Sequence, residues 1–196
     1  MFFEKKRETE VPPHPRREPR IDLPLSLENL KRTFCGCVDF ACRDVALAGD
    51  EARRITLCYL NGMVKMERVS DYVLRPMAQD GALAACPSMA RVMEQMEAGA
   101  LYNLGVERRE DMDGAVADLI GGSCLLLFPG ESAALSFNVG TEEKRSITPP
   151  GSETVLKGAR DSFVESIRTN TSMVRRHLKA PELKIGEHIV GRQSLT

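Results

Sequence analysis

Residues 157–196 read KGARDSFVESIRTNTSMVRRHLKAPELKIGEHIVGRQSLT, and this stretch predicts a long helix followed by a strand. Apolar side chains in its first half recur at steps of three and four residues, which places them on one helical face. Pro181 ends the helix, because the residue before a proline is pushed out of the α region. The predicted buried stripe comprises Phe163, Val164, Ile167, Thr171, Val174 and Leu178.

The other face of this helix is basic. Residues 157–196 carry a net charge of +4 and residues 1–20 a net charge of +2, whereas residues 21–156 carry −7. Basic ends on an acidic body can attract acidic partners or anionic membrane surfaces, although a solvated helix face is the simpler interpretation. The partner would be another subunit, the acidic body of this domain or anionic lipid. The candidate partner-binding residues are Arg168, Arg175, Arg176 and Lys179.

The same stretch resembles a motif of the A subunits of bacterial spore germination receptors, the GerA family. In that family a Gly-x-Arg-x-x-Phe-Val-Glu-Ser-x-Arg-Thr-Asn run leads into a basic helix, a proline and a strand. Asp161-Ser162 departs from the family pattern, which more often has an acidic residue and a glycine there. The matching positions are Gly158, Arg160, Phe163, Val164, Glu165, Ser166, Arg168, Thr169, Asn170, Arg175, Arg176, Lys179 and Pro181.

Two earlier segments extend this resemblance over nearly the whole chain from residue 23. LSLENLKRTFCGCVDFACRD is similar to the opening helix of the family, with Asp39 and Arg43 at matching positions and Cys37 where the family usually has serine. CYLNGMVKMERVSDYVLRPM resembles the strand, turn and helix that follow. The matches in this second segment are Tyr59, Gly62, Val64, Leu74, Pro76 and Met77.

The chain predicts an α/β fold, in which a small mixed α+β sheet is covered by amphipathic helices. Ser26 is a plausible N-cap for a helix over 26–46, and further helices are predicted over 65–77 and 110–120. The strands are 55–60, 123–128 and 132–139, with Pro129-Gly130 as a type II turn between the last two. The first two helices, at 26–46 and 65–77, cover the sheet.

Four regions follow from this reading. Residues 1–20 form a basic, proline-rich tail with little to bury. Residues 21–150 form the first subdomain, and residues 151–182 hold a linker and the long basic helix. Residues 183–196 are predicted to be the first strand of a truncated second subdomain. Such an unpaired strand predicts one of two outcomes. Either helix and strand exchange with a second copy across the hinge at Pro149-Pro150-Gly151, which is the favoured outcome, or residues 183–196 are poorly ordered.

The chain lacks the usual motifs of catalysis and cofactor binding. It contains no phosphate-binding loop, no Gly-x-Gly fingerprint and no Gly-x-Ser-x-Gly elbow,. Its six cysteines have no Cys-x-x-Cys spacing,, and its low aromatic content disfavours nucleic-acid stacking. We therefore predict a non-enzymatic protein without cofactor or metal, with reduced cysteines and no nucleic-acid partner.

The resemblance implies the N-terminal cytoplasmic domain of a germinant receptor A subunit. Such a subunit acts with B and C subunits in nutrient-triggered germination, through assembly and signal transmission. It would be held at the spore inner membrane by a downstream segment, while the 196 residues alone would be soluble. A SpoVAF-type paralogue shares these motifs. The alternative from another class is a soluble ligand-binding or regulatory enzyme domain with an unrecognised pocket.

Overall fold

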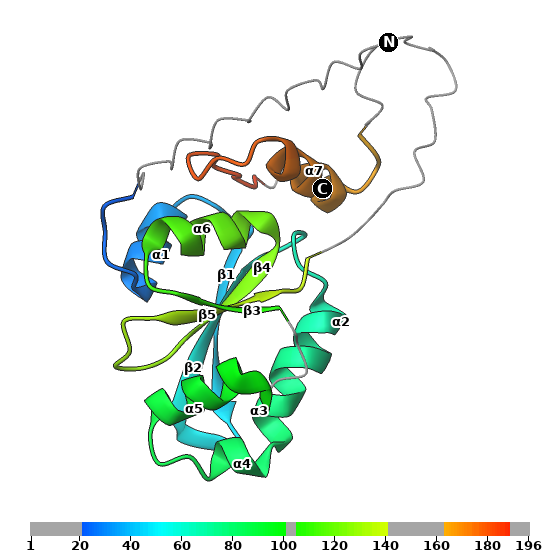
Figure 1. Cartoon of the computed structure of the whole chain (residues 1–196). Coiled ribbons are helices and arrows are strands. Elements are labelled where there is room, and N and C mark those ends of the chain that lie inside the picture. The colour runs from blue at the N-terminus through cyan, green and yellow to red at the C-terminus, as the bar shows by residue number, and fades with distance from the viewer. Residues whose placement is uncertain (1–20, 101–104, 141–162, 189–196) are drawn as a thin grey trace, which may run out of the picture.

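Five strands form one sheet in the computed structural model, which describes residues 21–100, 105–140 and 163–188 (Figure 1). Their order across the sheet is β1-β2-β4-β5-β3, and each neighbouring pair is antiparallel. The predicted combination of a small sheet with covering helices is confirmed. The strands are β1 (Phe40–Leu47), β2 (Asp50–Leu60), β3 (Val106–Arg109), β4 (Ser123–Leu127) and β5 (Ala134–Asn138).

Helices cover both faces of this sheet (Figure 1). Successive side chains of β2 point to opposite faces, so Leu57 and Tyr59 enter one core while Cys58 and Leu60 enter the other. The first core lies under the helices that follow β2 in the chain, and the second lies under α1 and α6. The helical elements are α1 (Leu27–Thr33), α2 (Met66–Val69), η1 (Ser70–Leu74), α3 (Arg75–Gln79), α4 (Gly81–Ala84), α5 (Met89–Gln95), η2 (Met96–Ala100), α6 (Met112–Gly121) and α7 (Ile167–His177).

The predicted hairpin is confirmed. Strands β4 and β5 pair from Ser123 opposite Asn138 to Leu127 opposite Ala134. At their turn the Glu131 N–H donates to the Phe128 carbonyl at 3.2 Å. Gly130 has a φ of +83°, as position i+2 of a type II turn requires. The strand expected over 55–60 lies within β2, and the helix expected over 110–120 is α6.

The helix predicted over 26–46 is wrong beyond its first two turns. Ser26 does cap α1, accepting a hydrogen bond from the Asn29 N–H at 3.2 Å, but the chain turns at Gly36 with a φ of +79°. Residues 40–47 then form β1 and pair with β2 along their length. The apparent helical stripe failed because strand pairing, which joins residues distant in sequence, outweighs a local pattern.

A proline within a helix accounts for an irregular turn in the second predicted helix. The helix expected over 65–77 is present as α2, η1 and α3, which run from Met66 to Gln79 without a break. Pro76 lies at the start of α3 and is buried. Proline lacks an N–H and clashes with the carbonyl four residues earlier. The π-helical turn of η1 (Ser70–Leu74) precedes it and accommodates this misfit,.

Candidate functional site

Helix α7 packs on the rest of the domain through its polar face. Ser172 and Arg175 are its buried residues, and they lie three positions apart, on the same side of the helix. The sequence predicts the opposite orientation, with the apolar stripe buried. Instead, Phe163 and Ile167 are both 69% exposed and Leu178 is 56% exposed. This prediction is wrong because the polar face meets specific partners at one end of the sheet.

The central partner is Asp39, the residue before β1. Its carboxylate accepts two hydrogen bonds from the Arg175 guanidinium, at 2.5 Å from Nε and 2.9 Å from Nη2. The Arg175 side chain is 1% exposed and that of Asp39 is 10% exposed. The guanidinium also lies 6.0 Å from the ring centre of Phe34 and 3.5 Å from the Leu183 carbonyl oxygen, to which it donates. These contacts tie α7 to α1, β1 and the segment after α7.

The ion pair fixes the charge state of Arg175. Burial by itself lowers the pKa of a guanidinium, because it disfavours the charged form. The hydrogen bonds and charge of Asp39 act in the opposite direction and prevail, so the pKa of Arg175 is raised above its usual value. Arg175 is therefore charged at physiological pH in its buried position,. A charge that stays buried needs its partner, because a lone buried ion is strongly destabilising.

Gly62 lies beside α7. It lies in the turn after β2 with a φ of +82°, a conformation that side chains with a Cβ rarely adopt,. A Cβ added at this position would lie 3.4 Å from Ser172 Cβ and 3.5 Å from the Arg168 carbonyl oxygen. A Cβ at this position would thus be in ordinary van der Waals contact with the helix, and it is the positive φ that favours glycine here,. We call Phe34, Asp39 and Gly62 the α7 seat.

The segment after α7 also contacts the seat, although not as a strand. The strand predicted from Leu183 is not formed over residues 183–188, which carry no strand pairing. These residues run alongside the loop between α1 and β1. The Val38 N–H donates to the Ile185 carbonyl at 2.9 Å, and Lys184 Nζ donates to the Thr33 carbonyl. A single backbone hydrogen bond is too little for a ladder, so the chain is extended without joining the sheet.

The start of α7 is built by the motif that carries the family resemblance. The helix begins at Ile167 rather than before residue 163, so the predicted helix is too long at this end. Ser166 caps it by accepting a hydrogen bond from the Thr169 N–H at 3.4 Å. The Asn170 side chain reaches back, accepting from the Val164 N–H at 2.8 Å and donating to the Val164 carbonyl at 2.6 Å. Such side chain-to-backbone hydrogen bonds compete with helical ones, so they set the N-terminal boundary of α7.

We expect Asn170→Ala to release this N-terminal segment. The variant removes both hydrogen bonds to Val164, each worth about 1 kcal/mol, so exchange of the Val164 amide should rise about tenfold or more. Hydrogen exchange measured by NMR tests this, with Asn170→Asp as the matched variant. Aspartate keeps the acceptor for the Val164 N–H but loses the donor to the Val164 carbonyl, so it should restore only part of the protection. Unchanged exchange at Val164 in Asn170→Ala would contradict this role.

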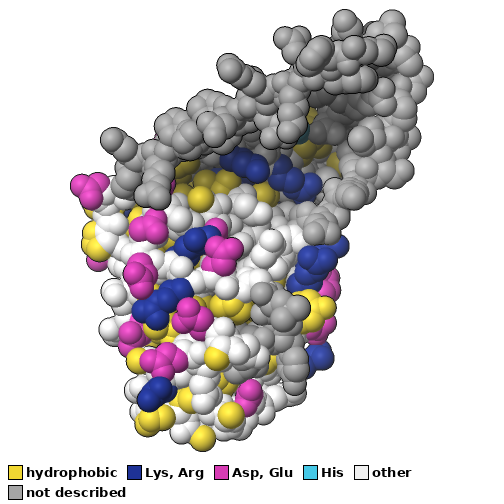
Figure 2. Space-filling model, viewed as in Figure 1, with side chains coloured by type: hydrophobic (Ala, Val, Ile, Leu, Met, Phe, Trp, Pro, Cys, Tyr) yellow, Lys and Arg dark blue, Asp and Glu magenta, His cyan; other side chains and the backbone are white. Residues whose placement is uncertain are grey.

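The structure does not bring the four candidate basic residues together on one open surface. Arg175 is inside, on Asp39, and Arg176 is half-buried, with Nη2 donating to Ser172 Oγ at 3.2 Å. Arg168 and Lys179 are exposed. Figure 2 shows basic side chains beside apolar ones near α7, while charges of both signs alternate over the rest of that view. The exposed basic surface is therefore narrower than the helix pattern predicts.

The remaining residues of the family motifs have varied surroundings. Arg43 is exposed on β1, opposite Leu57 in the register, and Glu165 is exposed just before α7. Gly158 and Arg160 lie outside the described residues. The functional pairing that sequence reasoning missed is that of Asp39 with Arg175. Both were singled out, but no local signal joins two residues separated by 136 positions.

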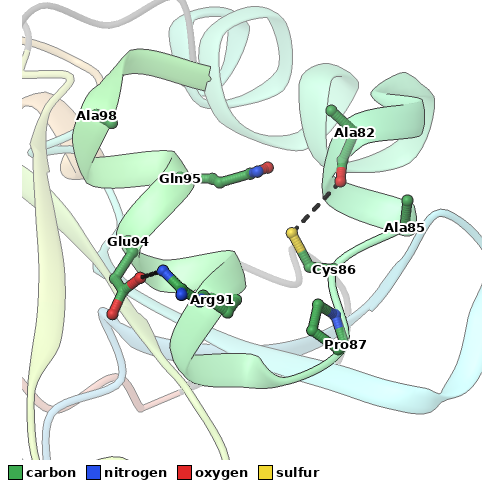
Figure 3. Close-up of a pocket in the computed structure, with 8 residues that line it drawn as sticks. All are labelled: Ala82, Ala85, Cys86, Pro87, Arg91, Glu94, Gln95 and Ala98. Carbon is green, nitrogen blue, oxygen red and sulfur yellow. Dashed lines mark hydrogen bonds and ion pairs between the residues drawn. The ribbon is translucent and has the colours of Figure 1, made fainter.

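A shallow hollow lies between α4 and α5 (Figure 3). Its volume is about 610 Å³, and small side chains such as Ala82, Ala85 and Ala98 line much of it. Its charged residues form an ion pair, in which Arg91 Nη1 lies 2.7 Å from Glu94 Oε2. No set of polar groups converges there in the described part of the chain, as a specific ligand site needs.

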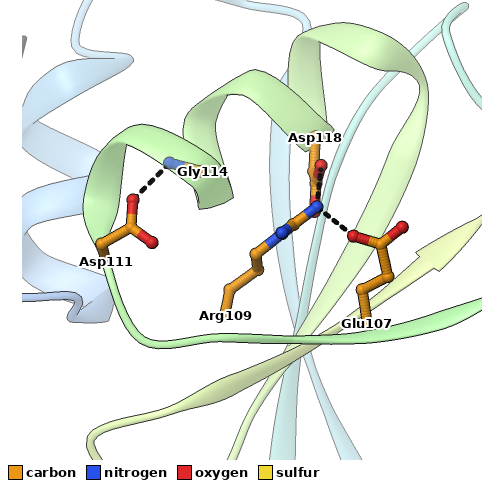
Figure 4. Close-up of polar contacts among 5 residues, drawn as sticks. All are labelled: Glu107, Arg109, Asp111, Gly114 and Asp118. Atoms are coloured by element: carbon orange, nitrogen blue, oxygen red, sulfur yellow. Dashed lines mark hydrogen bonds and ion pairs between the residues drawn. The ribbon is translucent and has the colours of Figure 1, made fainter. Parts of the chain in front are cut away.

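A polar cluster joins β3 to α6 (Figure 4). Arg109 donates to both carboxylate oxygens of Asp118, at 2.6 and 3.0 Å, and is also paired with Glu107. Asp118 raises the pKa of Arg109 through these hydrogen bonds. Asp111 caps α6 by accepting from the Gly114 N–H at 2.6 Å. Each charged group has a partner, so this cluster serves to hold edge strand β3 against the helix.

Two further observations concern metals and membranes. Within residues 21–100, 105–140 and 163–188, no three His, Cys, Asp or Glu side chains gather as a metal ion would need. None of the helices in these ranges combines the length and apolar character needed to span a bilayer,.

Comparison with known proteins gives consistent similarities. A family model described as Bacillus/Clostridium GerA spore germination protein matches residues 28–196. The chain is 30% identical to "Uncharacterized membrane protein YfkQ" of Bacillus subtilis (strain 168), covering 87% of this chain and 32% of that protein. It is 25% identical to "Spore germination protein KA" of the same organism, covering 81% and 28%. The chain thus spans about a third of the length of these relatives.

One solved structure shares the fold. It is the N-terminal domain of the A subunit of the Bacillus megaterium spore germinant receptor GerK3, with a TM-score of 0.64 and 22% identity. The match covers 85% of this chain and 58% of that one. At this level of identity the likeness establishes the arrangement of strands and helices.

Proposed function

Because the chain belongs to the Bacillus/Clostridium GerA spore germination protein family, we propose that it is the N-terminal cytoplasmic domain of a germinant receptor A subunit. It acts in nutrient-triggered spore germination without catalysing a reaction. The family match, the similarity to a spore germination protein and the fold of a receptor A-subunit domain support this assignment. We place the attachment to the spore inner membrane in a segment downstream of residue 196.

The observation that carries the mechanism is the buried Asp39–Arg175 pair. It makes α7 part of the domain through two charge-assisted hydrogen bonds, at 2.5 and 2.9 Å, which have directional geometry,. A change at the α7 seat is therefore transmitted to the position of α7. We propose that the domain passes a signal to the rest of the receptor through this helix.

The apolar side of α7 is the proposed contact surface for the rest of the receptor. Ile167 at the start of α7, Leu178 at its C-cap and Phe163 in the segment before it are all more than half exposed, whereas Ser172 and Arg175 of the same helix are buried. Exposed apolar side chains grouped on one helix face are typical of protein contacts. The occupants that we propose are the B and C subunits or the next part of the A subunit. Exchange with a second copy is the competing outcome. Arg168 and Lys179 flank this side and would meet an acidic surface or anionic lipid.

We expect the double variant Ile167→Asp, Leu178→Asp in the full-length subunit to lower the rate of nutrient-triggered germination about tenfold or more. A charge in an apolar contact costs roughly 2 kcal/mol or more, and both residues are exposed, so the domain itself should remain folded. Tyr72→Asp is the matched control, because Tyr72 is 43% exposed on η1. Germination followed by loss of optical density, with immunoblots of the B and C subunits, measures the effect.

Two outcomes would contradict different parts of the proposal. A normal germination rate in the double variant, at normal protein levels, would show that the apolar side of α7 is not the contact surface. A normal response of spores that lack the whole subunit to every nutrient tested would contradict the receptor role itself. Light scattering of the purified chain separates exchange with a second copy from contact with other subunits.

A further inference from the structure

Two thiols face each other across the hairpin of β1 and β2. Cys42 Sγ and Cys58 Sγ lie 3.2 Å apart, and the two residues are direct partners in the antiparallel register. Both contribute to the core under α1 and α6. Cys58 is fully buried, whereas Cys42 is half-buried and reaches solvent from edge strand β1. One thiol is thus accessible to a small reagent and the other is held behind it.

The backbone already has the geometry of a disulfide. Directly opposed residues of antiparallel strands have Cα atoms about 4.5 or about 5.5 Å apart, and disulfides span Cα separations of about 4.4 to 6.8 Å. The sulfur atoms therefore need side-chain rotation and no movement of the strands. Two of the other cysteines have backbone partners, as Cys37 donates to the Leu183 carbonyl and Cys86 to the Ala82 carbonyl.

We propose that Cys42 and Cys58 form a peroxide-sensitive thiol pair that closes to a disulfide. In the first step the Cys42 thiolate attacks hydrogen peroxide, the O–O bond breaks, and a sulfenic acid and hydroxide form. In the second step Cys58 Sγ attacks Cys42 Sγ, the S–O bond breaks, and water leaves with the proton of Cys58. Two thiols are oxidised, and one peroxide is reduced to two waters.

The surroundings of the pair assign the order of attack. The pKa of Cys42 is lowered, first by the hydrogen bond from Cys58 and then by the charge of Lys31. Burial and the charge of Asp44 act in the opposite direction and only partly offset this lowering. The same hydrogen bond, together with burial, raises the pKa of Cys58. Cys42 therefore supplies the thiolate, which is the reactive form. Cys58, held at contact distance, resolves the sulfenic acid with the rate advantage of a positioned group.

The link would close the hairpin that carries part of the α7 seat. Strand β1 begins directly after Asp39, so a covalent bond between Cys42 and Cys58 restricts the motion of the strand that positions this carboxylate. The proposal rests on the position of the two thiols and is independent of the receptor role.

The test uses the purified full chain and limiting hydrogen peroxide, followed by acid quench, alkylation in denaturant and peptide mapping by mass spectrometry. We expect linked peptides of Cys42 and Cys58 as the main oxidised product, and dithiothreitol should reverse the link. The same treatment in urea should abolish the preference for this pair. Both cysteines remaining free to alkylate, while exposed Cys35 is oxidised, would overturn the proposal.

Variants separate the two steps. Cys58→Ser keeps a hydrogen-bond donor beside Cys42 but cannot form the link, so it should stop the reaction at the Cys42 sulfenic acid, which dimedone captures. Cys35→Ser should leave the linked pair unchanged. Circular dichroism establishes that each variant is folded. Absence of dimedone labelling at Cys42 in a folded Cys58→Ser chain would contradict the assigned order of attack.

Discussion

Replacing Arg175 by alanine should detach α7 from the domain. The variant leaves the carboxylate of Asp39, which is 10% exposed, without its guanidinium. Removing one member of a buried ion pair costs about 3–5 kcal/mol. Undocking of α7 lets water reach Asp39, so the loss of stability appears first as local opening of the helix. Hydrogen exchange should show lost protection over residues 167–177, while strands β2, β4 and β5 stay protected.

Matched variants separate the ion pair from simple loss of charge. Arg168→Ala removes an exposed arginine from the same helix and should change stability by less than about 0.5 kcal/mol. Arg175→Lys keeps the charge but loses the paired geometry, because an ammonium cannot make the two parallel bonds of a guanidinium. The protection of α7 in Arg175→Lys should lie between its protection in Arg175→Ala and in Arg168→Ala. Equal protection of α7 in Arg175→Ala and Arg168→Ala would show that the pair does not hold the helix.

Replacing Gly122 by alanine should destabilise the whole domain by about 2–4 kcal/mol. Gly122 ends α6 with a φ of +94°, where a side chain strains the backbone. A Cβ there would lie 2.8 Å from the Met63 carbonyl oxygen and 3.1 Å from Gly140 Cα. Both neighbours are backbone atoms and cannot rotate away. Since Met63 follows Gly62 of the α7 seat, relief of the clash would also displace α7.

The neighbouring glycine provides the control for this variant. Gly121 is helical, and a Cβ added there meets nothing within 4 Å. Gly121→Ala should be neutral or stabilising by up to about 1 kcal/mol, because alanine is the better helix former. Urea unfolding of both variants measures the difference. If the two variants unfold at the same urea concentration, the close contacts at Gly122 do not make a side chain there destabilising.

The local pattern of residues was sufficient for elements whose signals are short-range. The Pro129-Gly130 turn and the apolar runs on each side predicted the β4–β5 hairpin, because proline and glycine meet the backbone requirements of that turn directly. The stripe of apolar residues in α6 likewise predicted that helix. Similarly, the run that contains Phe-Val-Glu-Ser indicated the family, because so long a motif is specific as a sequence.

Strand β1 and the orientation of α7 were decided by tertiary structure. The sequence from Phe34 to Ala46 has helical spacing, but pairing with β2 supplies backbone hydrogen bonds and burial that no local window contains,. Helix α7 has a clear apolar stripe, yet it docks by Arg175, because Asp39 offers that side chain two hydrogen bonds in a buried place. The strength of such a pair depends on bringing together residues 136 positions apart. Folding alone brings these residues together. The family resemblance named Asp39, and the basic helix face named Arg175, but neither could join the two residues.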